Sequence, residues 1–540
     1  MKFHAVWSSS LLAATAVSAA NSALPVDKVY GLGGWLLSEP WMFPNEWITM
    51  GGERCDDDCS RCAASEFGLV QKLGQKQADK AFESHWKTWF TKKDVDAIAA
   101  AGLNTVRVPV GWWINEGLVD RETEFFPRGG MRYLKRGLRM LKKKGIHAIL
   151  DLHALPGVST PNQMFAGRCT SDVQFYTEKN YNRALAWAAT MTTLAHVDPD
   201  FSNVFSIEAI NEPIMDSSKT PGYGEYQKNF VKVVRLTELA LGIQCPDTDY
   251  SRIFPSSNFT SSLDAGLLKV AETAEPVLAA ALRTTASSIQ QLAPQMELTT
   301  TNLRRAVGID AEIQAEVLPK VKEGHGAGRL TIRPDGKLIY KRSGDLSDGL
   351  DAIVPHGSSL ERHIARRSHR RARGVSASLS KETNRKCLTT MFPNKAWQWG
   401  DNVANPADAA NGPQAYDAHL YFSFGGVADP NAESYLRVIC NTDRVRQATA
   451  DNNRPLVFGE WSLATNFNAS REFLHDWADA QRLIYAGQAD GWIFWSFKIE
   501  AGSPNLPNWS YFASLDAGFF NKDPTKLNNP NVCDPWIQKA

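Results

Sequence analysis

Short apolar runs rich in β-branched residues alternate with longer amphipathic stretches along much of the chain. The apolar runs cover residues 29–36, 104–110, 146–153, 204–210, 388–397, 415–422, 456–459 and 491–497. Helical periodicity separates them, as in residues 92–101, closed by Gly102, and residues 131–144, stopped by Gly145. This alternation predicts parallel strands joined by helices. Eight strands without a GxGxxG phosphate-binding turn favour a closed (β/α)8 TIM barrel over an open doubly wound sheet.

The alternation lapses between Pro246 and Lys386, which predicts a long insertion between barrel elements. Its first part, residues 263–318, is rich in Ala, Leu and Thr and is expected to be helical. Its second part, residues 320–386, is polar, lacks Trp and Phe, and carries six arginines between Arg362 and Arg373. We expect this second part to be disordered and basic. A processing site and a patch for anionic polymers are the alternatives for its arginines.

The first residues resemble a secretory signal peptide. Lys2 precedes an apolar, small-residue stretch from Ala5 to Ala20, and Val17-Ser18-Ala19 is a suitable cleavage site. The stretch is shorter than the roughly 20 apolar residues that a membrane span needs. The predicted organisation is therefore a signal peptide at 1–19, a first barrel part at 20–245, the insertion at 246–386 and a second barrel part at 387–540. We expect a secreted protein, extracellular or in the cell wall, without membrane insertion.

Cysteine usage agrees with an oxidising compartment. The eight cysteines allow up to four disulfides, with the pairing left open by the sequence. The cluster Cys55, Cys59 and Cys62 has no partner CxxC and no nearby histidine, which disfavours zinc. Sequons at Asn258, Asn468 and Asn508 predict a glycoprotein.

Composition excludes several classes of function. The 540 residues carry 59 basic and 58 acidic side chains, a net charge of +1, so no global field attracts nucleic acid or an anionic membrane. The chain is 43% hydrophobic and contains 17 Trp, which suits a folded core and leaves aromatic rings for a sugar-binding cleft. We expect a monomer.

Two glutamates follow predicted strands at the end where a barrel carries its chemistry. Asn211-Glu212-Pro213 comes after residues 205–210, and Gly459-Glu460-Trp461 comes after residues 455–458. A carboxylate in an apolar setting is expensive unless it is used or paired. Paired carboxylates across a cleft are what glycoside hydrolysis requires, at about 5–5.5 Å in retaining enzymes.

Seven sequence blocks then occur in the order of a known family. The ordered set resembles glycoside hydrolase family 5, and most of all its fungal exo-β-1,3-glucanase branch. The blocks are Gly31–Trp41, Val106–Trp112, Asp151-Leu152-His153, Asn211-Glu212-Pro213, His419-Leu420-Tyr421, Gly459-Glu460-Trp461 and Gly491–Trp495.

The resemblance implies a TIM barrel and a retaining double displacement that needs no metal or organic cofactor. It implies that Glu212 is the acid/base and Glu460 the nucleophile. The other cleft residues that it implies are Arg107 beside the nucleophile, Asn211 on the sugar 2-hydroxyl, His153, His419 and Tyr421 around the sugar or the carboxylates, Trp495 as stacking platform, and Glu39 on the terminal glucose. Trp112, Trp113 and Trp461 stand near strand ends and are candidates for further subsites.

The expected activity is exo-hydrolysis of β-1,3-glucan. The loop from His153 to Asn162 and the insertion depart from the exo-glucanase pattern, so endo-action on β-1,6-glucan and transglycosylation stay open. A catalytically silent wall-binding barrel is a distant alternative, because both carboxylates are present.

Overall fold

The computed structural model describes residues 23–55, 58–253, 257–290, 328–332, 338–342 and 386–537. The predicted signal peptide and the arginines between Arg362 and Arg373 lie outside the described residues.

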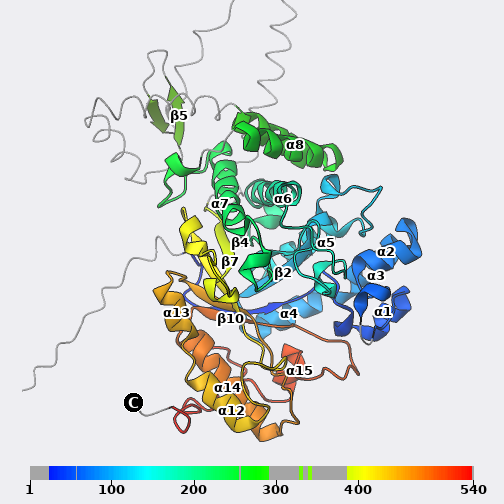
Figure 1. The fold of residues 1–540 in the computed structure, drawn as a ribbon, viewed down its shortest axis with the longest axis vertical. Coiled ribbons are helices and arrows are strands. Elements are labelled where there is room, and N and C mark those ends of the chain that lie inside the picture. Colours follow the sequence, from blue (N-terminus) through cyan, green and yellow to red (C-terminus); the bar gives the residue numbers. More distant parts are fainter. Residues whose placement is uncertain are drawn as a thin grey trace, which may run out of the picture.

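Eight described strands close a parallel barrel, as predicted (Figure 1). Their spatial order is β1-β10-β9-β8-β7-β4-β3-β2, and β1 completes the circle by pairing with both β2 and β10. The strands are β1 Val29–Gly33, β2 Thr105–Gly111, β3 His147–Ala154, β4 Val204–Glu208, β7 Thr389–Pro393, β8 Gln414–His419, β9 Leu456–Glu460 and β10 Gly491–Phe494.

Helices surround the barrel and connect its strands (Figure 1). The connecting helices are α4 Lys92–Ala100, α5 Gly130–Lys142, α6 Glu178–Val197, α7 Tyr223–Ala240, α12 Ala432–Cys440, α13 Arg444–Ala450 and α14 Arg471–Gly487. A long segment after β1 adds α1 Pro44–Met50, α2 Glu66–Leu73 and α3 Gln75–Trp89, and α15 Tyr511–Asp516 follows β10.

The barrel interior changes from apolar to charged along the strands. One end is filled by a separate apolar cluster that includes Ile149, Ala415 and Val457. Because side chains alternate along a strand, Asp151 shares the inward face of β3 with Ile149, and Asp417 shares that of β8 with Ala415. The two-residue period thus leads from a packed apolar layer to charged residues at the carboxyl ends, where barrel chemistry is located.

The first part of the insertion is helical. Helix α8, Ser257–Thr273, and a helix over 276–290 form an antiparallel pair, and α8 packs on α6 (Figure 1). Every residue of α6 from Ala184 to His196 is buried. This part of the insertion therefore covers a barrel helix that would otherwise expose an apolar face. Residues 291–318 of the expected helical stretch lie outside the described residues.

In the second part of the insertion, β5 Gly328–Ile332 and β6 Leu338–Arg342 pair as an antiparallel hairpin that the polar composition did not predict. The two ends of the insertion meet at the disulfide between Cys245 and Cys387, whose Cα atoms are 5.5 Å apart. The barrel is consequently continuous across the insertion.

All eight cysteines form disulfides, which is the maximum that the sequence allowed. The other three pairs are Cys55–Cys62, Cys59–Cys169 and Cys440–Cys533. Within the described part of the chain, no helix has both the length and the apolar character of a membrane span.

Candidate active site

The two glutamates singled out from the sequence lie together at the carboxyl end of the barrel. Glu460 is the last residue of β9, and Glu212 lies four residues beyond the end of β4. One carboxylate oxygen of each and one ring nitrogen of His419 all lie within 4.8 Å of one another. This spacing suits a retaining glycosidase, since inverting enzymes hold their carboxyl groups about 6.5–9.5 Å apart.

Arg107 on β2 connects the two sides of this site. Its guanidinium donates from Nε to Glu208 Oε2, from Nη1 to Glu460 Oε1 and from Nη2 to Asn211 Oδ1, each at 2.8 Å. The side chain is fully buried. Burial alone would lower the pKa of Arg107, but the carboxylates of Asp151 and Glu208 raise it well above its usual value. A permanent cation therefore faces the Glu460 carboxylate.

Tyr421 and His419 complete the surroundings of the two carboxylates. The Tyr421 hydroxyl donates to Glu460 Oε2 at 2.8 Å, and burial, reinforced by Glu460, raises the pKa of this phenol well above its usual value. His419 Nδ1 lies 2.8 Å from Glu212 Oε1 and 3.7 Å from Glu460 Oε2. Although burial alone would lower the pKa of His419, the carboxylates of Glu460 and Asp417 raise it well above its usual value. The cationic ring therefore donates to Glu212 and Asp417.

Three further predicted site residues are deeply buried. Glu39, His153 and Trp495 are 6%, 2% and 2% exposed. The His153 ring stacks on the Trp495 indole with centroids 5.6 Å apart, and Glu39 Oε2 accepts from Trp41 Nε1 at 2.9 Å. Burial, opposed by His153, raises the pKa of Glu39 to about 7. Gly33 is required here, because a Cβ on it would lie 2.4 Å from the Trp495 ring.

All nine predicted site residues thus belong to one connected cluster, but three buried carboxylates were missed. Asp151 binds His153 Nδ1 at 2.6 Å and Asp417 binds His419 Nε2 at 3.1 Å, so each aspartate orients the histidine two residues later. The two-residue period could have indicated both, since it puts each Asp-x-His pair on one strand face. Glu208 meets Arg107, a contact without a local sequence signal.

These carboxylates carry opposite pKa shifts. Burial raises the pKa of Glu208 well above its usual value in spite of Arg107. In Asp417, the His419 cation outweighs burial and lowers the pKa. Gly459 lets Asp417 approach β9: its backbone N–H donates to Asp417 Oδ1 at 2.7 Å, and a Cβ at Gly459 would lie 2.1 Å from that oxygen.

The tryptophans proposed for further subsites are in the core. Trp112, Trp113 and Trp461 are at most 6% exposed and pack against other core aromatic rings, so their burial does not support the expectation that they line subsites. The aromatic residues at the mouth are others. The half-buried Trp397 meets the His419 ring edge-to-face at 5.5 Å, and Trp399 is 60% exposed.

Two groups in the described part of the chain bring metal-ligating atoms close together. The first is Glu212, His419 and Glu460, and its atoms are engaged in the hydrogen bonds described above. The second is Glu238 with Cys245 and Cys387, whose sulfur atoms form a disulfide and are not thiolates. Hydrogen bonding and covalent pairing account for both groups.

Comparisons with known proteins agree with this geometry. The model of the family described as "Cellulase (glycosyl hydrolase family 5)" matches residues 70–269. A relative from Neosartorya fischeri, "Probable glucan endo-1,6-beta-glucosidase B", is 37% identical over 514 residues, covering 93% of this chain and 88% of the relative. "Probable glucan 1,3-beta-glucosidase A" from Aspergillus fumigatus is 29% identical over 242 residues, or 43% of this chain and 50% of the relative.

Among solved structures, the rutinosidase from Aspergillus niger has the same fold, with a TM-score of 0.51 and 15% sequence identity over 92% of this chain and 99% of that one. The near full-length relative, the family match and the eight-stranded barrel lead to one conclusion. The chain belongs to glycoside hydrolase family 5 and is an O-glycosyl hydrolase.

Proposed function

We propose that the enzyme hydrolyses β-glucan with retention of anomeric configuration, with Glu460 as nucleophile and Glu212 as acid/base. The observation that carries this proposal is the approach of one oxygen from each carboxylate, together with His419, to within 4.8 Å. The donors also differ between the two groups. Glu460 accepts hydrogen bonds from the Arg107 guanidinium and the Tyr421 hydroxyl, which fix the position of the nucleophile.

In the first step, a Glu460 oxygen attacks the anomeric carbon while Glu212 gives its proton to the departing glycosidic oxygen. His419 Nδ1 contacts Glu212 Oε1 and so orients this carboxyl group. In the second step, water attacks the anomeric carbon while Glu212 accepts a proton from the water, and the bond from that carbon to Glu460 breaks to release the carboxylate. Asn211, held by Arg107, is available to the sugar 2-hydroxyl.

For the linkage, we put internal β-1,6 bonds before β-1,3 bonds, which reverses the order that the sequence motifs suggested. The support is the relative named for endo-1,6 activity, which is similar along nearly the whole chain. The exposed rings of Trp399 and Phe424, at 60% and 77%, offer a polymer apolar surface, and the Phe424 ring contacts that of Tyr421.

Exo-hydrolysis of β-1,3-glucan is the second candidate. The deep burial of Glu39, His153 and Trp495 supports it, because an exo-acting enzyme must surround the terminal sugar of a chain. The shorter match to a relative named for 1,3-β-glucosidase activity points the same way. Transglycosylation uses the same site with a sugar hydroxyl in place of water. Secretion as a monomer is part of the proposal, and the four disulfides support an oxidising compartment.

Substitution of the two glutamates tests the chemistry. Glu460→Gln should lower kcat by about 10⁴-fold or more, because no nucleophile remains. Glu212→Gln should lower kcat by about 10²–10⁴-fold, because the leaving group is no longer protonated. Glu433→Gln, an exposed carboxylate that pairs with Arg437, is the control and should keep wild-type activity. Full activity of Glu460→Gln would refute the assignment.

Product analysis tests the linkage and the stereochemistry. Oligosaccharides from pustulan would establish endo-β-1,6 action, and glucose alone from laminarin would establish exo-β-1,3 action. Growth of products with added acceptor would indicate transglycosylation. The first product seen by NMR should be the β-anomer, and an α-anomer would exclude the retaining mechanism. If neither glucan is hydrolysed, the result would favour the alternative of a catalytically silent wall-binding barrel.

A further inference from the structure

The backbone that carries Glu212 is held by side chains from a distant loop. Residues 211–214 follow β4 and belong to no strand or helix. Thr160 Oγ1 donates to the Glu212 carbonyl oxygen. Tyr176 accepts from the Ile214 N–H at 2.9 Å and donates to the Ser159 carbonyl at 3.0 Å. Burial raises the pKa of the Tyr176 phenol above its usual value, so the hydroxyl keeps the proton that lets it bridge both groups.

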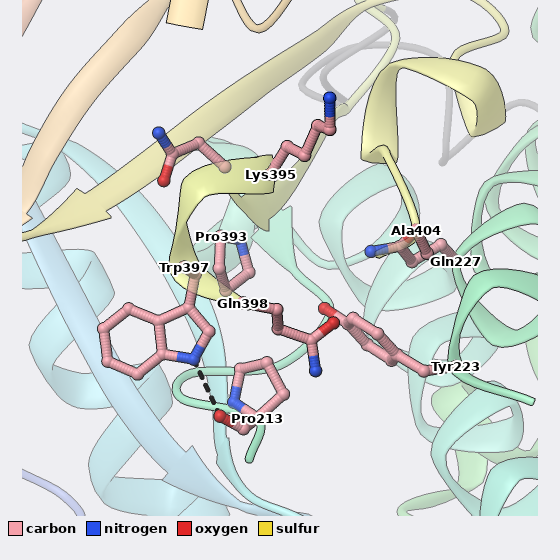
Figure 2. A pocket seen from close by; sticks show the side chains of 9 residues that line it. Pro213, Tyr223, Gln227, Pro393, Lys395, Trp397, Gln398 and Ala404 are labelled. Atoms are coloured by element: carbon pink, nitrogen blue, oxygen red, sulfur yellow. Dashed lines mark hydrogen bonds between the residues drawn. The ribbon is translucent and has the colours of Figure 1, made fainter. Parts of the chain in front are cut away.

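A second loop contributes two more such contacts. Trp397 Nε1 donates to the Pro213 carbonyl at 2.7 Å, as Figure 2 shows. The neighbouring Gln398 donates from Nε2 to the Ile214 carbonyl at 2.6 Å. Three consecutive residues from Glu212 to Ile214 are therefore fastened to two loops through side chains.

The loop after β3 is itself well anchored. Cys169 ties it to Cys59 in the segment after β1, and its Gly167 carbonyl accepts from the Phe67 N–H at 2.9 Å. Val158, just before Ser159, has φ of 67°, in the left-handed region that β-branched residues avoid. Such a conformation persists only where the surrounding structure enforces it. This is the loop that departs from the exo-glucanase pattern after His153.

We propose that Thr160 and Tyr176 are positioning residues of the reaction, which hold the Glu212 backbone so that its carboxyl group meets both His419 and the glycosidic oxygen. This inference rests on the proposed acid/base role of Glu212. A displacement of about 1 Å in a reacting group can cost roughly 10²-fold in rate, so four side-chain contacts at this position are chemically significant. In this role Thr160 and Tyr176 act through the backbone of residues 212–214.

Leaving-group dependence separates this role from a general structural one. A 2,4-dinitrophenolate departs without protonation, whereas phenolate needs the acid. The substrates are therefore 2,4-dinitrophenyl and phenyl β-gentiobiosides, or the laminaribiosides if β-1,3 bonds are cleaved. In Tyr176→Phe, kcat/KM, which reports the first step alone, should fall by about 10- to 10²-fold on the phenyl glycoside and by less than about 3-fold on the dinitrophenyl glycoside.

Tyr181→Phe is the matched control. Tyr181 lies in the same aromatic group, with ring centroids 6.4 Å apart, and its hydroxyl donates to the Pro221 carbonyl at 2.8 Å, away from Glu212. Tyr181→Phe also loses one hydrogen bond to a backbone carbonyl and should keep the wild-type kcat/KM on both substrates. An equal fall on both substrates in Tyr176→Phe, or the same pattern in Tyr181→Phe, would overturn the proposal.

Thr160 provides an independent test if Tyr176→Phe does not fold. Thr160→Val should reproduce the selective loss on the phenyl glycoside, and Thr160→Ser, which keeps the donor, should restore it. Glu212→Gln is measured in parallel. If it lacks the leaving-group dependence, the proposed function fails; if it has that dependence and the Thr160 and Tyr176 variants lack it, only this inference fails.

Discussion

Burial decides the charge of Glu66, a residue that the sequence does not mark. Its side chain is almost fully buried, and Oε1 accepts from the Ser38 N–H at 2.8 Å, one residue before Glu39. Burial raises the pKa of Glu66 to about 8 against the hydrogen bond from Ser38. The protonated acid therefore holds the segment that carries Glu39.

This shift predicts a pH dependence of stability. Between the ordinary glutamate pKa and about 8, the native state binds a proton at Glu66 that the unfolded state has lost. Stability from this group is thus complete below the ordinary pKa and declines as the pH rises to about 8, by up to about 1.4 kcal/mol per pH unit.

The measurement is urea unfolding of wild type and Glu66→Gln between pH 5 and 8. Because glutamine does not titrate, the free energy of unfolding should fall less steeply in the variant. Glu433→Gln is the exposed control and should follow the wild type. Parallel curves for wild type and Glu66→Gln would show that Glu66 titrates normally.

At the scale of elements, helix α6 depends on the insertion that covers it. The helix buries three threonines, Thr190, Thr192 and Thr193. Each hydroxyl donates at 2.8 Å to the backbone carbonyl one turn earlier, so these polar groups have hydrogen-bond partners in an apolar setting. Gly266 allows α8 to come close, because a Cβ there would lie 2.6 Å from Ala186 Cβ. Helix α8 of the insertion is therefore part of the packing that supports the barrel.

A neighbouring pair of leucines on α8 tests this dependence. Leu267 is fully buried, so Leu267→Ala should lower the free energy of unfolding by about 2–5 kcal/mol through lost contacts and a cavity. Leu268 is 41% exposed, and Leu268→Ala should change the free energy of unfolding by less than about 0.5 kcal/mol. Equal effects in denaturant titrations would mean that α8 does not stabilise the barrel.

At the scale of the whole molecule, disulfides fasten segments that are remote in sequence. Cys245–Cys387 spans 142 residues and closes the insertion, and Cys440–Cys533 spans 93 residues. Glu238, beneath the first of these, accepts from the Leu388 N–H at 2.7 Å and pairs with Arg235. The end of the insertion is therefore held by a covalent bond and by a buried ion pair.

Loop length predicts the relative worth of two disulfides. In the chain-entropy account, Cys245–Cys387 stabilises by about 5 kcal/mol and the seven-residue separation of Cys55–Cys62 by about 2 kcal/mol. Cys245→Ser with Cys387→Ser should therefore lower the denaturant midpoint more than Cys55→Ser with Cys62→Ser. The opposite order would indicate that native contacts, and not the unfolded chain, dominate.

Local patterns alone determined much of this protein. The two periodicities located all eight strands within a few residues, and Glu212 and Glu460 were recognisable because each lies at or just beyond the carboxyl end of such a strand. A residue's position on a strand face is a property of its immediate neighbours, so it can be read from the sequence.

Tertiary structure alone decided what surrounds these glutamates. Arg107 and Glu460 are 353 residues apart in sequence, and Trp397 and Pro213 are 184 apart, yet both pairs are hydrogen-bonded. The disulfide pairing, the packing of α8 on α6, and the hydrogen bonds from Thr160 to Glu212 and from Ile214 to Tyr176 are of the same kind. Such contacts arise only when the barrel closes and brings remote loops to one end, and no local pattern encodes them.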